Sequence, residues 1–125
     1  MKSRMNYDLV VIGSGAAGHH GAIQGAKLGK RVAVIERGSW LGGATINTGM
    51  IPSKTVREAV LRPTNHGENL VDRIERVAVN ESTVYANQFR RNAVDVLTGE
   101  ASFVSPNLIR VKNGTKTRSL KRIAF

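Results

Sequence analysis

The sequence contains no cysteine, and this absence excludes several kinds of chemistry. Disulfide bonds, zinc sites with thiolate ligands and redox reactions of a dithiol pair all require cysteine side chains. Any function of this chain must therefore depend on other side chains and on the backbone.

Long apolar runs are also missing. The aliphatic run near the N-terminus covers only residues 9–12, which is too short for the hydrophobic core of a signal peptide or for a membrane span. We therefore expect a cytoplasmic protein that does not cross a membrane. The 125 residues are enough for one domain.

Acidic and aromatic residues are scarce, whereas basic residues are abundant. The 19 Lys and Arg residues exceed the 9 Asp and Glu residues and give a net charge of +10. Such a charge can indicate nucleic-acid binding, but the basic residues are scattered and the few aromatic residues are not interleaved with them. We predict no nucleic-acid partner. A solvated basic surface, charge balanced by another part of the molecule, and a basic interaction module remain as alternatives.

The first forty residues have the pattern of a strand, a helix and a second strand. The continuous aliphatic run at residues 9–12 predicts a strand buried on both faces. Residues 15–28 are rich in Ala and Gly and end at Gly29, which predicts a helix. Residues 32–35 predict another buried strand, so the segment indicates a βαβ unit with parallel strands.

A glycine-rich turn connects the first strand to the helix. Gly13, Gly15 and Gly18 have GxGxxG spacing, and Glu36 follows eighteen residues after Gly18, at the end of the second strand. In this context the first glycine allows the turn, the second lets a pyrophosphate approach the helix N-terminus, and the third allows close packing. The Glu36 carboxylate can accept hydrogen bonds from ribose hydroxyls and would repel a 2′-phosphate. A tight turn in a ligand-free α/β domain is the alternative.

The rest of the chain is predicted to add helices and a small antiparallel meander. Residues 38–49 read as a loop, Pro52 begins a helix over residues 51–61, and residues 63–69 interrupt the pattern. Apolar residues then recur at helical spacing for about 20 residues from Leu70. Four short strands are expected at residues 94–97, 101–104, 108–111 and 119–123. Asn113-Gly114 between the last two strands is a strong hairpin signal.

A second motif indicates which nucleotide the turn binds. Residues 42–54, GGATINTGMIPSK, follow the second strand. They resemble the GG-x-C-x-N-x-G-C-x-P-S-K signature of the FAD-dependent pyridine nucleotide disulfide oxidoreductases. Together with Glu36-Arg37 and residues 99–103, the resemblance extends over essentially the whole chain. It implies FAD as cofactor and the α/β class, with a Rossmann-like FAD-binding βαβ unit in a domain that is incomplete.

The sequence departs from this signature at the two redox cysteines. Thr45 and Met50 occupy their positions, so the chain cannot pass electrons through a disulfide. The sequence around them, residues 47–61 (NTGMIPSKTVREAVL), is most similar to the transhydrogenase branch of the family. The resemblance to that branch implies hydride transfer between NADH and NADP through FAD.

The resemblance also implies roles for individual residues. Glu36 would hold the adenosine ribose, Arg37 would lie near the adenine, and the backbone at Ala101 would meet the adenine edge. Thr45 would line the path of the ribityl chain and pyrophosphate, and Lys54 would be a catalytic residue near flavin N5, where a cation tunes hydride transfer. The backbone of four residues in the glycine turn would bind the FAD pyrophosphate, namely Ser14, Gly15, Ala17 and Gly18. The complete predicted set is Gly13, Ser14, Gly15, Ala17, Gly18, Glu36, Arg37, Gly42, Gly43, Thr45, Lys54 and Ala101. No metal site is predicted, because the adjacent His19 and His20 would point in different directions on a helix.

The resemblance further implies that other domains belong to the whole protein. The chain has no second GxGxxG, so we expect residues 1–125 to be the N-terminal part of an FAD-binding domain. NAD(P)H would bind only through domains that are not present here, the whole protein would be a homodimer, and the isolated chain would be inactive. Two alternatives are an inert FAD- or ADP-binding fragment and the same segment of a dihydrolipoamide dehydrogenase-like protein that has lost its cysteines.

Overall fold

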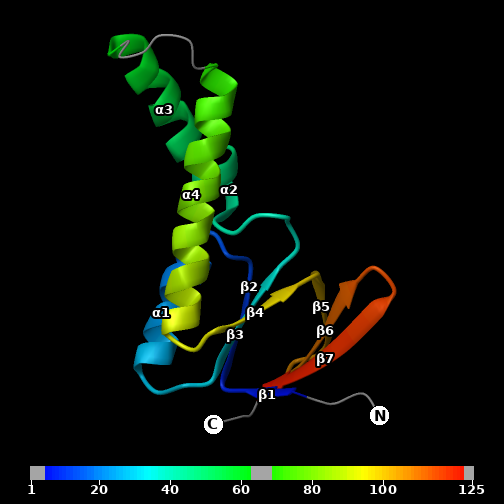
Figure 1. Cartoon of the computed structure of the whole chain (residues 1–125). Helices are drawn as coiled ribbons and strands as arrows, with labels where there is room; N and C mark the ends of the chain where they lie inside the picture. The colour runs from blue at the N-terminus through cyan, green and yellow to red at the C-terminus, as the bar shows by residue number, and fades with distance from the viewer. Residues whose placement is uncertain (1–4, 63–68, 123–125) are drawn as a thin grey trace.

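The computed structural model describes residues 5–62 and 69–122, so most of the predicted break at residues 63–69 lies outside the described residues. The elements form two sheets and four helices within these ranges (Figure 1). Their bounds are β1 Met5–Tyr7, β2 Leu9–Ile12, α1 Ala16–Lys27, β3 Val32–Glu36, α2 Gly43–Asn47, α3 Met50–Leu61, α4 Leu70–Arg91, β4 Asp95–Thr98, β5 Glu100–Ser105, β6 Leu108–Asn113 and β7 Lys116–Arg122.

The first sheet has the order β2-β3-β4, and both of its strand pairs are parallel. The predicted βαβ unit is therefore confirmed, with α1 as its crossover helix. Residues 94–97 were predicted to be a strand of the antiparallel meander, and this assignment was wrong. Strand β4 pairs in parallel with β3 and extends the first sheet. The long helix α4 causes this difference, since it brings the chain back in the same direction as β3.

The second sheet has the order β1-β7-β6-β5. Strands β5, β6 and β7 form the antiparallel meander expected from the sequence. Gly114 has a φ of 57° in the β6–β7 turn, a conformation that favours glycine. Strand β1 pairs in parallel with β7 and was not predicted, because three residues are too few for a periodic pattern.

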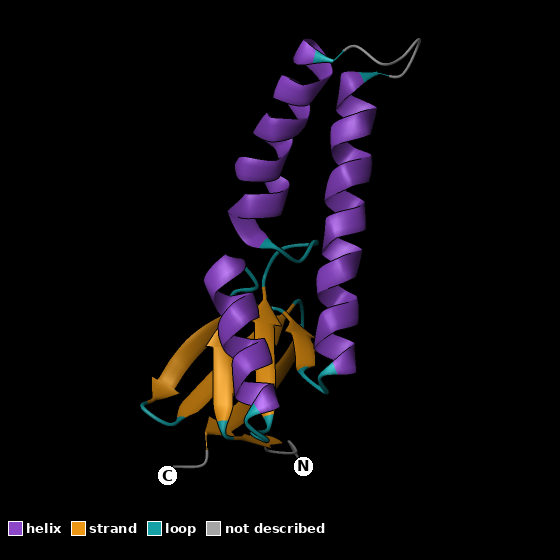
Figure 2. Ribbon diagram, turned by 90° about the vertical axis from the view of Figure 1, so that its left-hand side faces the viewer, coloured by secondary structure: helices purple, strands orange, loops and turns teal. Residues whose placement is uncertain are grey.

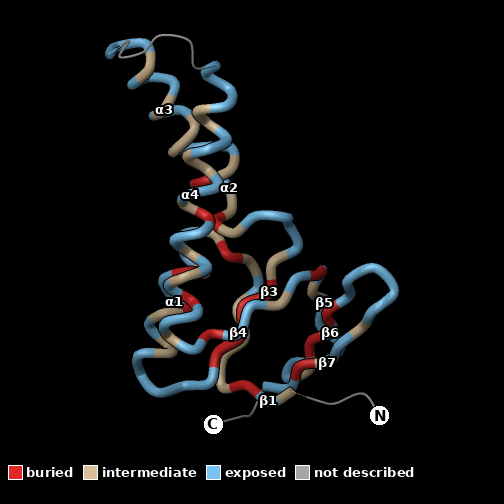
Figure 3. The backbone as a smooth tube through the Cα atoms, in the orientation of Figure 1, coloured by how far each residue is buried: buried red, intermediate tan, exposed pale blue. Residues whose placement is uncertain are grey.

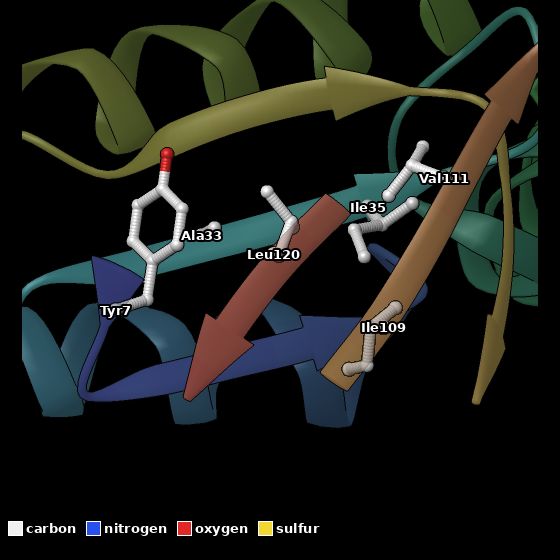
Figure 4. Close-up of a cluster of buried hydrophobic side chains, with 6 residues drawn as sticks. All are labelled: Tyr7, Ala33, Ile35, Ile109, Val111 and Leu120. Carbon is white, nitrogen blue, oxygen red and sulfur yellow. The ribbon is translucent and has the colours of Figure 1, made fainter. Parts of the chain in front are cut away.

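Strand β3 lies between two hydrophobic clusters, and alternate side chains enter each of them. Ala33 and Ile35 pack against the second sheet with Tyr7, Ile109, Val111 and Leu120 (Figure 4). Val32 and Val34 face the helices, where they pack with Ala22, Phe89 and Val94. The tube in Figure 3 shows this buried stretch on β3. The prediction that this strand is buried on both faces is confirmed.

The same prediction for β2 was wrong. Its residues are only partly buried, and the side chain of Ile12 is 50% exposed. Strand β2 pairs with β3 on one side and forms the edge of the parallel sheet among the described elements. An edge strand keeps more of its surface accessible than a central strand.

Helix α3 and the N-terminal part of α4 lie side by side and extend away from the sheets, whereas the C-terminal end of α4 packs against the parallel sheet through Phe89 (Figures 1 and 2). Both were predicted with nearly these bounds. Residues 38–49 were expected to be a loop, but they contain the short helix α2, whose five residues cannot show a helical period. The Asn47 side chain stabilises this turn by donating to the Gly43 carbonyl at 2.9 Å.

Candidate functional site

The glycine turn has the geometry that a phosphate site requires. Gly13 has a φ of 96°, and its N–H donates to the Ile35 carbonyl at 2.8 Å. A Cβ at Gly15 would meet no atom within 4 Å, so the space above the N-terminus of α1 is open. A Cβ at Gly18 would instead overlap the Gly13 carbonyl oxygen. The turn at Gly13 and the close packing at Gly18 thus agree with the prediction, and the space at Gly15 is open.

The N-terminus of α1 offers unpaired backbone donors beside this space. Gly15 is the N-cap, no side chain of residues 5–62 or 69–122 caps the helix, and the first turn contains no acidic residue. The first N–H groups of a helix have no intrahelical acceptor and attract anions. Ala17 lies exposed in this turn. The arrangement fits a pyrophosphate.

The Glu36 carboxylate lies next to the glycine turn at the end of β3. Its Oε2 atom accepts hydrogen bonds from the Ser14 N–H at 3.0 Å and from the Ser14 hydroxyl, and its Oε1 atom accepts from the Gly38 N–H at 2.8 Å. Partial burial raises the pKa of Glu36, but hydrogen bonds from Ser14, Gly38 and the Arg37 backbone outweigh it and lower the pKa below its ordinary value. The carboxylate is therefore ionised at neutral pH.

Ser14 connects the two glycine motifs through its side chain. The residue is fully buried, and its hydroxyl donates to Glu36 while it accepts from the Gly42 N–H at 3.1 Å. The sequence suggested only a backbone role facing a pyrophosphate, whereas the Ser14 N–H donates to Glu36 in this structure. The signal available in the sequence was a serine between Gly13 and Gly15, in a turn expected to lie at the same sheet edge as Glu36.

The second glycine motif packs directly against the first. Gly42 has a φ of 106°, and a Cβ at Gly43 would lie 2.8 Å from the Gly15 Cα. The Leu41 N–H donates to the buried Ser82 hydroxyl at 3.0 Å. Sequence reasoning missed Ser82, because it lies on α4 and 41 residues away from Leu41.

A pocket of about 290 Å³ opens at the carboxyl ends of the parallel strands. It brings together four of the predicted residues, Gly13, Glu36, Arg37 and Ala101. The bend between β4 and β5 forms one side of the pocket. The Gly99 N–H holds this bend against β3 by donating to the Glu36 carbonyl at 2.8 Å. The complete lining is Ile12, Gly13, Ile35, Glu36, Arg37, Gly99, Glu100 and Ala101. The lining thus combines two acidic residues, one basic residue and apolar residues, and the pairing of the Glu36 carboxylate with apolar surface fits an adenosine.

The remaining predicted residues lie outside this pocket. Thr45 is half-buried on α2, and Lys54 is exposed on α3. Met50, at the other former cysteine position, is 50% exposed at the start of α3. Neither Thr45 nor Lys54 lines the pocket at Glu36.

Two further features concern metals and membranes. Among residues 5–62 and 69–122, no group of three or more potential metal ligands lies together. Within the same ranges, every helix is too short or too polar to cross a lipid bilayer.

Comparisons with known proteins agree with this geometry. Residues 8–109 match the family model of FAD dependent oxidoreductases. The chain is 44% identical to the soluble pyridine nucleotide transhydrogenase of Mycobacterium tuberculosis over 124 residues, covering 86% of this chain and 26% of the relative. The corresponding protein of Hahella chejuensis is 40% identical over 124 residues, which cover 86% of this chain and 27% of the relative.

A solved structure supports the same fold. The HOCl-induced flavoprotein disulfide reductase RclA from Escherichia coli, solved as a Cu(II) complex, has a TM-score of 0.84 and 30% sequence identity to this chain. The match covers 93% of this chain and 26% of that protein. The chain therefore spans about a quarter of the length of its relatives. It belongs to the FAD-dependent oxidoreductase family, with a Rossmann-like fold and FAD as its cofactor.

Proposed function

We propose that this chain is the N-terminal FAD-binding segment of a flavoprotein whose whole protein transfers hydride between NADH and NADP through FAD. The observation that carries the proposal is the meeting of the glycine turn, Glu36, Arg37 and Ala101 around one pocket. The relatives named soluble pyridine nucleotide transhydrogenase support the choice of reaction.

The pocket at Glu36 is the proposed site of the adenosine. The ionised carboxylate of Glu36 accepts hydrogen bonds from the ribose hydroxyls. Arg37 and Ala101 line the same pocket, and in this proposal they lie beside the adenine. The backbone of residues 15–18, at the uncapped N-terminus of α1, binds the pyrophosphate.

The flavin half of the proposed site continues along the second glycine motif. Gly42, Gly43 and Thr45 line the path away from the pyrophosphate, and Lys54 provides a cation beside the flavin. When bound, FAD supplies the acceptor and donor of hydride. The chain itself supplies binding and electrostatics, because it has no cysteine for a disulfide step.

The proposal includes the context of the whole protein. NADH and NADP bind to domains beyond these residues, since the chain has a single GxGxxG. The whole protein is a cytoplasmic homodimer in this proposal. The alternative proposal is that the chain is a fragment that binds FAD or ADP and has no catalytic role.

The test is FAD retention by the purified 125-residue chain. The chain is incubated with FAD, desalted, and examined for a flavin absorption band. We expect the band to be retained, and Glu36→Ala to weaken FAD binding by about tenfold, because a charged hydrogen bond to the ribose is lost. Glu58→Ala is the matched control, since Glu58 lies on α3 and pairs with Arg62 at the surface. A colourless wild-type chain would contradict the proposal that this chain is an FAD-binding segment.

A further inference from the structure

We infer that the Ser14 side chain positions Glu36 for the adenosine ribose, and so determines how strongly the site selects ligands with ribose hydroxyls. The inference rests on the proposed role of Glu36 as the acceptor for those hydroxyls. The inference gives the Ser14 hydroxyl a function of its own. Binding of a pyrophosphate by the glycine turn would need only backbone N–H donors, not this hydroxyl.

The geometry joins three segments at one buried hydroxyl. Ser14 lies in the turn after β2, Glu36 ends β3, and Gly42 begins the second glycine motif. The Ser14 hydroxyl donates its proton to Glu36 and accepts from the Gly42 N–H at 3.1 Å. Because Ser14 is fully buried, bulk solvent does not compete for either bond.

Counting acceptor positions shows what these bonds leave for a ligand. A carboxylate offers about four lone-pair positions. On Glu36 the Oε2 atom accepts two hydrogen bonds from Ser14, and the Oε1 atom accepts one from the Gly38 N–H. The Arg37 backbone also stabilises this carboxylate, so a ribose hydroxyl would bind by sharing or displacing a backbone donor, while the two bonds from Ser14 keep Oε2 in place. Glu36 lines the pocket.

This arrangement lowers the entropic cost of binding. A free glutamate side chain loses rotamer freedom when it is ordered by a ligand. Here the Ser14 hydroxyl and N–H order the Glu36 carboxylate before the ligand arrives, and such preorganisation increases affinity. Removing the hydroxyl would leave Oε2 with one donor and the Gly42 N–H without its acceptor, so the carboxylate would be less well placed.

The experiment compares two nucleotides by isothermal titration calorimetry with the 125-residue chain. ADP carries both ribose hydroxyls, whereas 2′,3′-dideoxy-ADP carries neither. We expect Ser14→Ala to weaken ADP binding by about tenfold and to leave dideoxy-ADP binding nearly unchanged. In a Glu36→Gln background, the same substitution should have little further effect on ADP. Ser14→Gly provides a second variant that removes the hydroxyl.

Ser82→Ala is the matched control. Ser82 is also a buried serine whose hydroxyl accepts a loop N–H, that of Leu41, but it does not contact Glu36. We expect this variant to preserve the preference for ADP over dideoxy-ADP. A second readout is the pH profile of ADP affinity. The hydroxyl of Ser14 lowers the pKa of Glu36, so the acidic limb of the profile should move to higher pH in Ser14→Ala.

The outcomes separate this inference from the proposed function. If Glu36→Gln weakens ADP binding while Ser14→Ala and Ser14→Gly do not, the inference is wrong and the role of Glu36 stands. Equal losses for ADP and dideoxy-ADP in the Ser14 variants would show a merely structural role and also overturn it. If the wild-type chain binds neither FAD nor ADP, the proposed function fails, and the inference fails with it.

Discussion

At the scale of single residues, His19 shows how packing alters the pKa of a histidine side chain. Its ring stacks on Tyr85 with centroids 3.9 Å apart and meets Phe89 edge-on at 5.2 Å, between α1 and α4. Within the described ranges, neither ring nitrogen has a hydrogen-bond partner of ordinary geometry. Burial lowers the pKa of His19, and the nearby Gln88 side chain opposes this effect only in part. These contacts make His19 a packing residue between α1 and α4.

This environment predicts a pH-dependent stability. His19 is neutral in the folded chain, and its pKa is lower there than the ordinary value of about 6.5 in the unfolded chain. Protonation therefore favours the unfolded chain, so the contribution is complete above about pH 6.5 and is lost as the pH falls below it. Thermal unfolding followed by circular dichroism should give a Tm that decreases toward acidic pH, with a shallower decrease in His19→Phe.

The control for this prediction is His20→Gln. His20 is exposed, and its Nδ1 atom lies 2.7 Å from the Ala16 carbonyl oxygen. The charge of His20 makes only the smallest contribution to the lowered pKa of His19, so we expect the control variant to keep most of the wild-type dependence of Tm on pH. Identical pH profiles for wild type and His19→Phe would contradict the role of His19.

At the scale of elements, the short strand β1 connects the two sheets. Its last residue, Tyr7, is 1% exposed, and its hydroxyl donates to the Asp95 carboxylate on β4 at 2.8 Å. The Arg31 guanidinium lies over the ring, 5.1 Å from its centroid. Burial and, to a smaller degree, Asp95 raise the pKa of Tyr7 to about 12. A strand of three residues is thus held by side-chain contacts as well as by pairing with β7.

We therefore expect Tyr7→Phe to lower the free energy of unfolding by about 1 kcal/mol, since one hydrogen bond to a partly solvated carboxylate is lost. Urea denaturation would measure the change. Asp95→Asn should add little in the Tyr7→Phe background if the two residues act as a pair. Additive effects of the two substitutions would show that they stabilise the chain independently.

At the scale of the whole molecule, the two clusters on either face of β3 position the site. The helices pack on one face and the meander on the other, so the ends of β2 and β3 and the β4–β5 bend meet at one edge. Ligands of open α/β sheets bind at this carboxyl edge. The pocket at Glu36 lies there.

The 125-residue chain by itself should bind nucleotide without catalysing hydride transfer between nicotinamides. The chain has one GxGxxG and spans about a quarter of the transhydrogenase relatives. We expect no steady formation of NADPH from NADH and NADP by the pure chain with FAD, as measured by chromatography of the products. One of the soluble transhydrogenase relatives serves as the positive control in the same assay. Steady turnover by the pure chain would overturn this expectation.

Local patterns in the sequence were sufficient to predict the βαβ unit, the long helices and the β5–β7 meander. These features depend on periodicity and turn residues within a few positions, as at Gly13 and at Asn113-Gly114. The FAD motifs are equally local, because the spacing from Gly13 to Glu36 is determined by the turn, one helix and one strand.

Only the tertiary structure decided which partners these elements have. It placed β4 beside β3, left β2 at an edge, and added β1 to β7. It also joined Ser14 to Glu36, 22 residues later, and buried His19 against Tyr85. The physical reason is that burial and side-chain hydrogen bonds depend on residues distant in the chain, which motif spacing and local propensity do not specify.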